Sequence, residues 1–198
     1  MRINARKREI SLKIVYYGPG LSGKTTNLKS IHRSAPDSNR GELLVLDTET
    51  ERTLFFDYFP LTLGELDGFR VKLDFFTVPG QSFYQRTRGL VLNGADGAVF
   101  VADSNPRREQ ANLLSMEDLV ASLKEEGKDP ASFPLVFQWN KQDMRGAAKP
   151  ATLNKLLNPY GHPAFSAVAI RGEGVSETQQ AIVKGVLDSL RNRKKASA

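Results

Sequence analysis

The sequence Gly18-Pro-Gly-Leu-Ser-Gly-Lys-Thr25 matches the pattern G-x-x-x-x-G-K-[ST]. It follows the apolar run Leu12–Tyr17 and leads into a stretch of helical spacing, so a strand should precede it and a helix follow it. Glycines let backbone N–H groups converge on phosphate oxygens, and the helix N-terminus adds partial positive charge. We expect Lys24 to neutralise the β- and γ-phosphates and the Thr25 hydroxyl to bind Mg²⁺. The motif therefore predicts a phosphate-binding loop rather than a tight turn with a capping threonine.

Apolar runs alternate with helical patterns along the chain. Leu12–Tyr17, Ala98–Ala102 and Leu135–Trp139 are short and nearly continuous apolar runs, typical of parallel strands buried on both faces. The segments 107–126 and 174–193 carry apolar residues at three- and four-residue steps. This spacing predicts two amphipathic helices.

One segment is expected to run antiparallel. Leu54–Leu66 and Phe69–Val78 are strand-like and are separated by Asp67-Gly68, a dipeptide typical of two-residue hairpin turns. The second run alternates apolar and polar residues, which places the pair near a sheet edge. We therefore predict one three-layer α/β domain: a mixed, mostly parallel sheet of about six strands, wrapped by about five helices. Its core would span about residues 10–192, between short basic tails at 1–9 and 191–198.

Composition excludes several classes of protein. The chain has 198 residues, 40% of them hydrophobic and 25% charged, which excludes overall disorder. No apolar run is long enough to cross a membrane, and the basic first residues lack the apolar core of a secretory signal, so we expect a cytoplasmic protein. The absence of cysteine excludes disulfides and thiol chemistry. His32 and His162 have no partner spacing for a metal site.

The net charge of +6 allows contact with nucleic acid or an anionic membrane. Part of this charge lies in the two terminal segments, and the sequence contains no nucleic-acid motif. We therefore expect solvated basic tails, no nucleic-acid partner and at most a weak peripheral membrane contact.

A second motif indicates which base is bound. Asn140-Lys-Gln-Asp143 directly follows the apolar run Leu135–Trp139, so it lies at the carboxyl end of a strand, where ligands bind in open parallel sheets. The Asp143 carboxylate can accept hydrogen bonds from N1–H and the 2-amino group of guanine. Adenine offers neither donor there and would leave the carboxylate unpaired. The motif therefore favours a guanine nucleotide.

In their order and approximate spacing, four motifs resemble those of Ras-like small GTPases: the phosphate loop, Thr77-Val-Pro-Gly80-Gln81, Asn140-Lys-Gln-Asp143 and Phe165-Ser-Ala-Val168. The resemblance covers about residues 10–192. Tyr17–Leu28, Glu51-Arg-Thr-Leu-Phe-Phe-Asp57 and Thr77–Gln81 further resemble the bacterial MglA group, small GTPases that set cell polarity and control gliding or twitching motility. The resemblance implies the Ras-like G domain of the P-loop NTPases, with GTP or GDP and Mg²⁺ as ligands.

The resemblance also implies roles for single residues. Thr53 resembles the threonine that joins Mg²⁺ and senses the γ-phosphate, Gly80 should offer its N–H to that phosphate, and Gln81 should orient the attacking water. Arg52 resembles an arginine finger supplied by the chain itself, although it could be an ordinary exposed cation. The expected nucleotide-binding residues are Gly18, Gly20, Leu21, Ser22, Gly23, Lys24, Thr25, Thr26, Thr53, Gly80, Asn140, Lys141, Asp143, Ser166, Ala167 and Val168; the catalytic ones are Lys24, Arg52 and Gln81; the Mg²⁺ ligands are Thr25 and Thr53.

At the guanine end, the resemblance implies that Lys141 packs along the base plane. Ser166, Ala167 and Val168 should bring backbone N–H groups to the base O6, although this short motif could also be a plain buried strand.

Two positions depart from the usual small-GTPase pattern. Pro19 removes one backbone donor from the phosphate loop. Thr77 stands where most small GTPases have an aspartate that holds Mg²⁺ through water.

The missing carboxylate at Thr77 would weaken or rearrange the metal shell. Asp57 or Asp47 could supply a replacement, and the sequence leaves that choice open. The MglA group normally carries this threonine, so the resemblance does not imply an inactive protein.

The resemblance implies a switch with slow intrinsic hydrolysis, in which GTP orders residues 50–58 and 79–90. An MglB-like Roadblock-domain dimer would act as the activating protein, effectors would bind the switch regions, and the chain alone would be monomeric. Three alternatives remain: a scaffold that binds GTP without useful hydrolysis, an ATP-dependent small-molecule kinase, and a nucleic-acid protein. The aromatic residues in the switch segments are candidate partner contacts or, equally, strand core: Phe55, Phe56, Tyr58, Phe83 and Tyr84.

Overall fold

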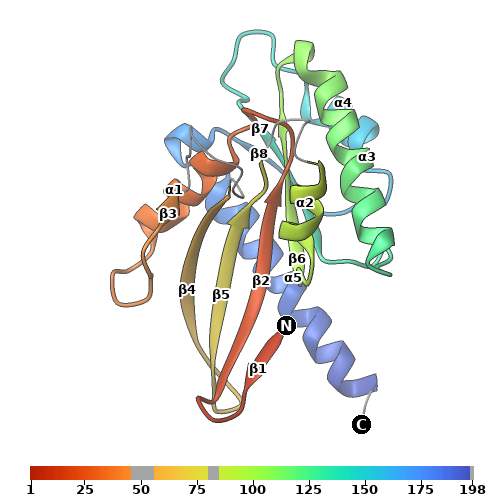
Figure 1. Cartoon of the computed structure of the whole chain (residues 1–198). Coiled ribbons are helices and arrows are strands. Elements are labelled where there is room, and N and C mark those ends of the chain that lie inside the picture. The colour runs from red at the N-terminus through yellow and green to blue at the C-terminus, as the bar shows by residue number, and fades with distance from the viewer. Residues whose placement is uncertain (46–55, 80–84, 197–198) are drawn as a thin grey trace.

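The computed structural model describes residues 1–45, 56–79 and 85–196 (Figure 1). Within these ranges the chain forms eight strands, five α-helices and short 3₁₀ turns at Pro106–Arg108 and Ala169–Arg171. The strands and helices, in chain order, are β1 (Arg2–Asn4), β2 (Glu9–Tyr17), α1 (Lys24–Ser34), β3 (Leu44–Val45), β4 (Asp57–Leu66), β5 (Phe69–Thr77), α2 (Gln85–Leu92), β6 (Gly97–Asp103), α3 (Glu109–Glu125), β7 (Leu135–Asn140), α4 (Pro150–Leu157), β8 (Ala164–Ala167) and α5 (Val175–Ala196).

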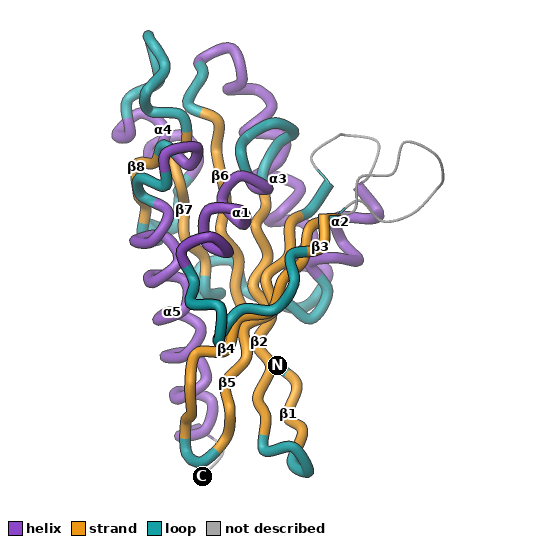
Figure 2. The backbone as a smooth tube through the Cα atoms, turned by 90° about the vertical axis from the view of Figure 1, so that its left-hand side faces the viewer, coloured by secondary structure: helices purple, strands orange, loops and turns teal. Residues whose placement is uncertain are grey.

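The strands form one mixed sheet in the order β3-β4-β5-β2-β6-β7-β8, with β1 added beside β2. The four pairings from β5 through β2, β6 and β7 to β8 are parallel, whereas β1–β2, β3–β4 and β4–β5 are antiparallel. Helices α1 and α5 pack on one face, and α2, α3 and α4 pack on the other (Figure 2). The predicted three-layer α/β fold is confirmed.

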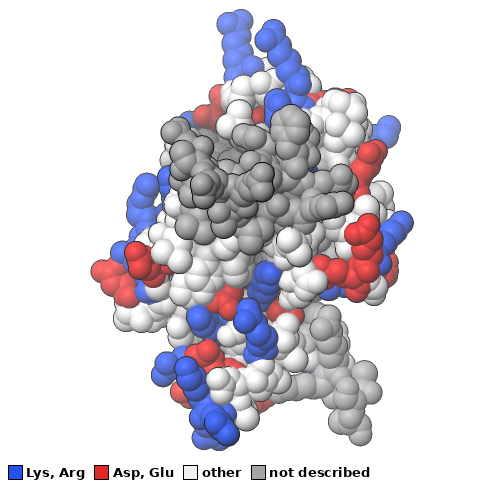
Figure 3. Space-filling view, in the orientation of Figure 1, with Lys and Arg blue, Asp and Glu red and all other residues white. Residues whose placement is uncertain are grey.

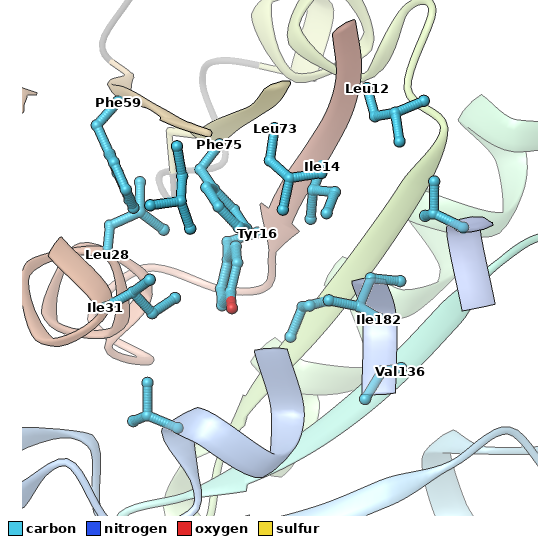
Figure 4. Packing of buried hydrophobic residues seen from close by; sticks show 14 of the residues in the cluster. Leu12, Ile14, Tyr16, Leu28, Ile31, Phe59, Leu73, Phe75, Val136 and Ile182 are labelled. Carbon is cyan, nitrogen blue, oxygen red and sulfur yellow. The ribbon is translucent and has the colours of Figure 1, made fainter. Parts of the chain in front are cut away.

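The central strand shows why its sequence is apolar throughout. Leu12, Ile14 and Tyr16 enter the core under α1 and α5, while Val15 and Tyr17 enter the opposite core under α2 to α4. All five are fully buried, because a parallel strand covered on both sides has no wet face. Figure 4 shows the first of these cores from close by, with side chains of the sheet facing those of α1 and α5.

The expected hairpin is present. Asp67 and Gly68 join β4 to β5 with φ angles of 52° and 75°, as a two-residue turn with positive φ at both positions requires. The pair lies toward one edge of the sheet, where only the two-residue strand β3 continues it. The segments predicted to be helical at 107–126 and 174–193 form α3 and α5.

Three details differ from the sequence expectation. The sheet has eight strands in the described residues rather than about six, because β1 and β3 have only three and two residues and are too short to show a pattern. Residues 2–4, expected within a basic tail, form β1 because β2 begins at Glu9 whereas β6 pairs with it only from Ile14 onward. The first residues of β2 thus have an open side for β1 to pair with. Residues 191–196, also expected in a tail, continue α5.

No helix in the described ranges is long and apolar enough to span a membrane.

Candidate nucleotide-binding site

The phosphate loop connects the end of β2 to the start of α1. Gly18 has a φ of 138°, and a Cβ there would lie 2.3 Å from the Val101 carbonyl oxygen. Gly23 has a φ of 102°, and a Cβ there would lie 2.2 Å from Nδ2 of Asn140. Both positions therefore require glycine for backbone conformation and for space. The motif glycines let the loop lie directly against β6 and β7.

The helix that follows begins without a side-chain cap. Gly23 is the N-cap of α1, no side chain in the described residues caps that end, and the first turn contains no acidic residue. Its donors include the N–H groups of Thr25 and Thr26, which an α-helix leaves without intrahelical acceptors. This uncapped end is electrically suited to an anion.

Lys24 lies inside the loop. Its side chain is buried, and its Nζ donates to the carbonyl oxygens of Gly18 at 3.0 Å and Pro19 at 2.8 Å. Burial and the nearby Arg88 guanidinium lower the pKa of Lys24 to about 7, although Asp57 acts in the opposite direction. A phosphate in the loop would offset this desolvation, so the site favours an anionic ligand.

A carboxylate lies beside the expected Mg²⁺ ligand. The Thr25 hydroxyl donates to Oδ2 of Asp57 at 2.6 Å, and the Thr77 hydroxyl donates to the same oxygen at 2.9 Å. The Thr77 hydroxyl also accepts the backbone N–H of Asp57 at 2.8 Å. Asp57 is buried, and its carboxylate is held in place by the hydroxyl groups of Thr25 and Thr77. Hydroxyl and carboxylate oxygens suit Mg²⁺, and the donor set fits that ion once phosphate oxygens are added.

The guanine motif is joined to the phosphate loop through Asn140. Its Nδ2 donates to the carbonyl oxygen of Ser22 at 2.8 Å, and its Oδ1 accepts the backbone N–H of Ala169 at 2.9 Å. Asn140 is buried at the end of β7. One side chain thus connects the phosphate loop to the loop after β8, which places both predicted binding segments at the carboxyl edge of the sheet.

The charged residues of this motif are paired. Nζ of Lys141 lies 2.7 Å from Oδ2 of the buried Asp103, and the Asp143 carboxylate lies 3.6 Å from Nη1 of Arg171. Arg171 also contacts Glu173 at 2.7 Å. The sequence reasoning did not identify Asp103, Arg171 or Glu173, since no motif marks them.

The residues expected to bind the base O6 lie in and directly after β8, beside the carboxyl end of β7. Ser166 and Ala167 pair with Trp139 and Asn140 in the parallel ladder. The N–H of Val168 donates to the carbonyl oxygen of Glu173 at 3.0 Å. That bond would have to break before Val168 could donate to a base.

Two further contacts near the loop were not foreseen. Arg108, at the start of α3, donates from Nη2 to the carbonyl oxygen of Gly20 at 2.8 Å. Asp118 of α3 accepts the Tyr17 hydroxyl and, at 2.9 Å, Nη1 of Arg88 from α2. Burial and this carboxylate raise the pKa of Tyr17 far above its usual range. Sequence separations of 88 and 101 residues leave no local signal for either contact.

Several predicted residues lie outside the described ranges: Arg52 and Gln81 of the expected catalytic set, Thr53 and Gly80 of the expected nucleotide-binding set, Asp47, and the aromatic residues Phe55, Phe83 and Tyr84. Of the remaining aromatic candidates, Phe56 and Tyr58 both pack against Phe76 of β5, with ring centroids 5.8 and 4.8 Å apart. These three rings line a groove of about 950 Å³ between β1 and β5. Figure 3 shows both basic and acidic side chains on the lower part of the surface, where β1 and β5 lie.

Comparison with known proteins adds one relative. No family model matches the chain. The chain is 49% identical over 189 residues to the mutual gliding-motility protein MglA of Myxococcus xanthus (strain DK1622), and the match covers 96% of this chain and 97% of that protein.

Proposed function

Because the chain belongs to the MglA group of Ras-like small GTPases, we propose that it binds GTP, hydrolyses it to GDP and phosphate, and thereby switches a process of cell polarity or motility. The observation that supports this most directly is the Asn140 side chain, which hydrogen-bonds the phosphate loop and the loop after β8 together. A nucleotide could therefore occupy both parts of the site at once. No such link would be needed for an isolated phosphate-binding turn.

Binding would divide between the two parts. The phosphates lie against the uncapped N-terminus of α1 and the buried Lys24 ammonium. The base lies against Lys141, and Asp143 accepts its N1–H and 2-amino hydrogens. Arg171 lies 3.6 Å from one oxygen of the Asp143 carboxylate, and the remaining lone pairs of the carboxylate would accept from the base. Selection of guanine over adenine follows from the donors that Asp143 requires.

Mg²⁺ would be held by the Thr25 hydroxyl, with the Asp57 carboxylate in its surroundings and Thr53 as a further ligand. When bound, the ion neutralises charge that develops on the phosphate oxygens. Thr77 orients Asp57 through two hydrogen bonds and so compensates for the aspartate absent at its own position. Of the two candidate carboxylates, Asp57 has this geometry, and Asp47 lies outside the described residues.

Hydrolysis would require residues of the two switch segments. Gln81 orients the attacking water, Gly80 donates to the γ-phosphate, and Arg52 stabilises the negative charge of the transition state. Hydrolysis by the chain alone is slow, because Arg52 and Gln81 reach these positions only when an MglB-like Roadblock-domain dimer binds. Phe56 and Tyr58, at the end of the first switch segment, are half-buried against Phe76 and would offer their remaining surface to such a partner or to effectors.

The test is GTP turnover with Mg²⁺, with and without a co-encoded Roadblock-domain protein. Arg52→Ala and Gln81→Ala should each remove most of the stimulation by the partner. Arg33→Ala and Gln110→Ala, at exposed positions of α1 and α3, serve as matched controls and should retain it. Tight GTP binding without turnover in any of these conditions would instead indicate the scaffold function. Failure to bind GTP would contradict the proposal altogether.

A further inference from the structure

Arg108 holds one peptide group of the phosphate loop from outside the motif. It ends the turn Pro106–Arg108 and reaches back to the carbonyl oxygen of Gly20 at 2.8 Å. Its Nε is buried and has no hydrogen-bond partner in the part of the chain that the structure describes. The side chain thus lies over the loop with only some of its donors satisfied, and the Gly20 contact is its attachment to the motif.

The peptide group that Arg108 contacts is the one most able to flip. Ser22 N–H donates to the carbonyl oxygen of Pro19 at 3.3 Å, so Pro19–Ser22 is a β-turn whose central peptide joins Gly20 to Leu21. Leu21 has a φ of 66°, as the third residue of a type II turn does. A type I turn would give Leu21 a negative φ, and the two turns differ by a flip of that central peptide.

Leucine does not favour the observed form. A positive φ at a non-glycine residue is strained, and the Leu21 side chain is 86% exposed, so core packing does not hold it. An interaction elsewhere must therefore stabilise this turn. The hydrogen bond from Arg108 acts on the peptide concerned.

The orientation of this peptide matters for phosphate binding. Because the peptide is planar and trans, the Gly20 carbonyl and the Leu21 N–H point in opposite directions. Arg108 draws the carbonyl toward itself and so directs the Leu21 N–H away from itself, which would let that N–H join a nest of backbone donors around a phosphate. A flipped peptide would present a carbonyl oxygen where the phosphate needs a donor.

We propose that Arg108 is a positioning residue of the nucleotide site: it keeps the Gly20–Leu21 peptide in the form that donates to phosphate. This inference rests on the proposed nucleotide binding, and it adds a residue that lies outside all the motifs. Arg108 acts on the loop before the ligand arrives, so its contribution is preorganisation.

The first measurement compares GDP affinity of Arg108→Met and Arg107→Ala. Methionine keeps most of the aliphatic stem and removes the donors, whereas Arg107 is an exposed cation in the same turn and controls for charge. We expect Arg108→Met to raise the Kd for GDP about tenfold, the scale of a lost hydrogen bond to a charged donor. Arg107→Ala should stay close to the unchanged protein.

The second measurement separates positioning from a general structural role. Leu21→Gly removes the strain of the positive φ, so the observed turn no longer depends on Arg108. The double variant Leu21→Gly with Arg108→Met should therefore recover most of the lost affinity. A loss of charge or a damaged fold would not be repaired at position 21.

The outcomes are distinct. If the unchanged protein and Arg107→Ala both fail to bind GDP, the proposed function fails before Arg108 is tested. If both bind and Arg108→Met binds equally well, the positioning role is wrong. It is equally wrong if Arg108→Met binds weakly and Leu21→Gly restores nothing. If Arg108→Met does not fold, the comparison is made with Arg108→Lys, whose Kd for GDP should lie between that of the unchanged protein and the tenfold higher value expected for Arg108→Met.

Discussion

The phosphate end and the guanine end of this site treat charge in opposite ways. Lys24 is buried against carbonyl oxygens, and its pKa is lowered to about 7. Lys141 and Asp143 are paired instead, with Asp103 and Arg171. If the proposed function holds, the phosphate end would gain most from an incoming anion, whereas the guanine end, whose charges are already paired, would select the base through its hydrogen-bond donors and acceptors. Affinity for the nucleotide and selectivity for its base would then come from different parts of the fold.

Replacing Lys24 would break this contrast most strongly. We expect Lys24→Met to bind GDP at least about 100-fold more weakly, because charge-assisted hydrogen bonds to phosphate are lost. The thermal stability of the nucleotide-free protein should change little, since a desolvated ammonium is also removed. A nucleotide titration checks the expected loss of GDP affinity, and a melting curve of the nucleotide-free protein checks the expected thermal stability. A large drop in the melting temperature with unchanged affinity would contradict this assignment.

Changing Asp143 tests the selective end. Asp143→Asn should weaken GDP binding about 30-fold, because the amide cannot accept both hydrogens of guanine. Xanthosine diphosphate, which carries an oxygen in place of the 2-amino group, should bind the variant better than it binds the unchanged protein. Asp188→Asn, on the exposed side of α5, is the matched control. Equal losses for both nucleotides would mean that Asp143 does not read the base.

The Thr77–Asp57 pair can be tested through the metal. Thr77→Val removes the hydroxyl that both accepts the Asp57 N–H and donates to its carboxylate. We expect the Mg²⁺ concentration needed to retain bound GDP to rise about tenfold, as for other groups that orient metal-site carboxylates. Thr77→Ser keeps the hydroxyl and should behave normally. Equal Mg²⁺ requirements for both variants would exclude this orienting role.

The pH dependence of binding sharpens the same comparison. A bound phosphate raises the pKa of Lys24, so above pH 7 the free protein must take up a proton when GDP binds. The Kd should therefore rise with pH, about fivefold between pH 7 and 8. Calorimetry at pH 8 in buffers of different ionisation enthalpy should detect the proton taken up. A Kd that falls over this interval would contradict the lowered pKa.

The sequence predicted what is local. The strands and helices with clear periodicity are present, and the glycine-rich loop and Asn140–Asp143 lie at the predicted edge of the sheet, because a few neighbouring residues encode each of them. The Asp67-Gly68 turn is of the same kind. The two short strands β1 and β3 carry no periodic pattern, and they form because neighbouring strands offer open backbone partners.

Contacts between distant segments could not be predicted in this way. Asp57 and Thr25 are 32 residues apart, so the sequence left Asp57 and Asp47 as equal choices. The contact of Arg108 with Gly20 spans 88 residues and has no motif at one end. Such contacts depend on how β4, β6 and α3 are placed around the phosphate loop. That placement is set by the packing of the whole sheet and its helices and not by neighbouring residues. The roles of Arg52, Thr53, Gly80 and Gln81 stay predictions.

The double hydrogen bond of Asn140 has a consequence for timing. The Asn140 side chain hydrogen-bonds both the Ser22 carbonyl and the Ala169 N–H, so the loop expected to bind phosphate and the loop expected to bind the base are linked through one residue. When the nucleotide loses its contacts with one loop, the shared Asn140 side chain would disturb the other loop as well. The nucleotide would therefore dissociate from both loops in one step. If the chain acts as the proposed switch, GDP would then stay bound until both loops open together, and its release would be slow and would occur in one step.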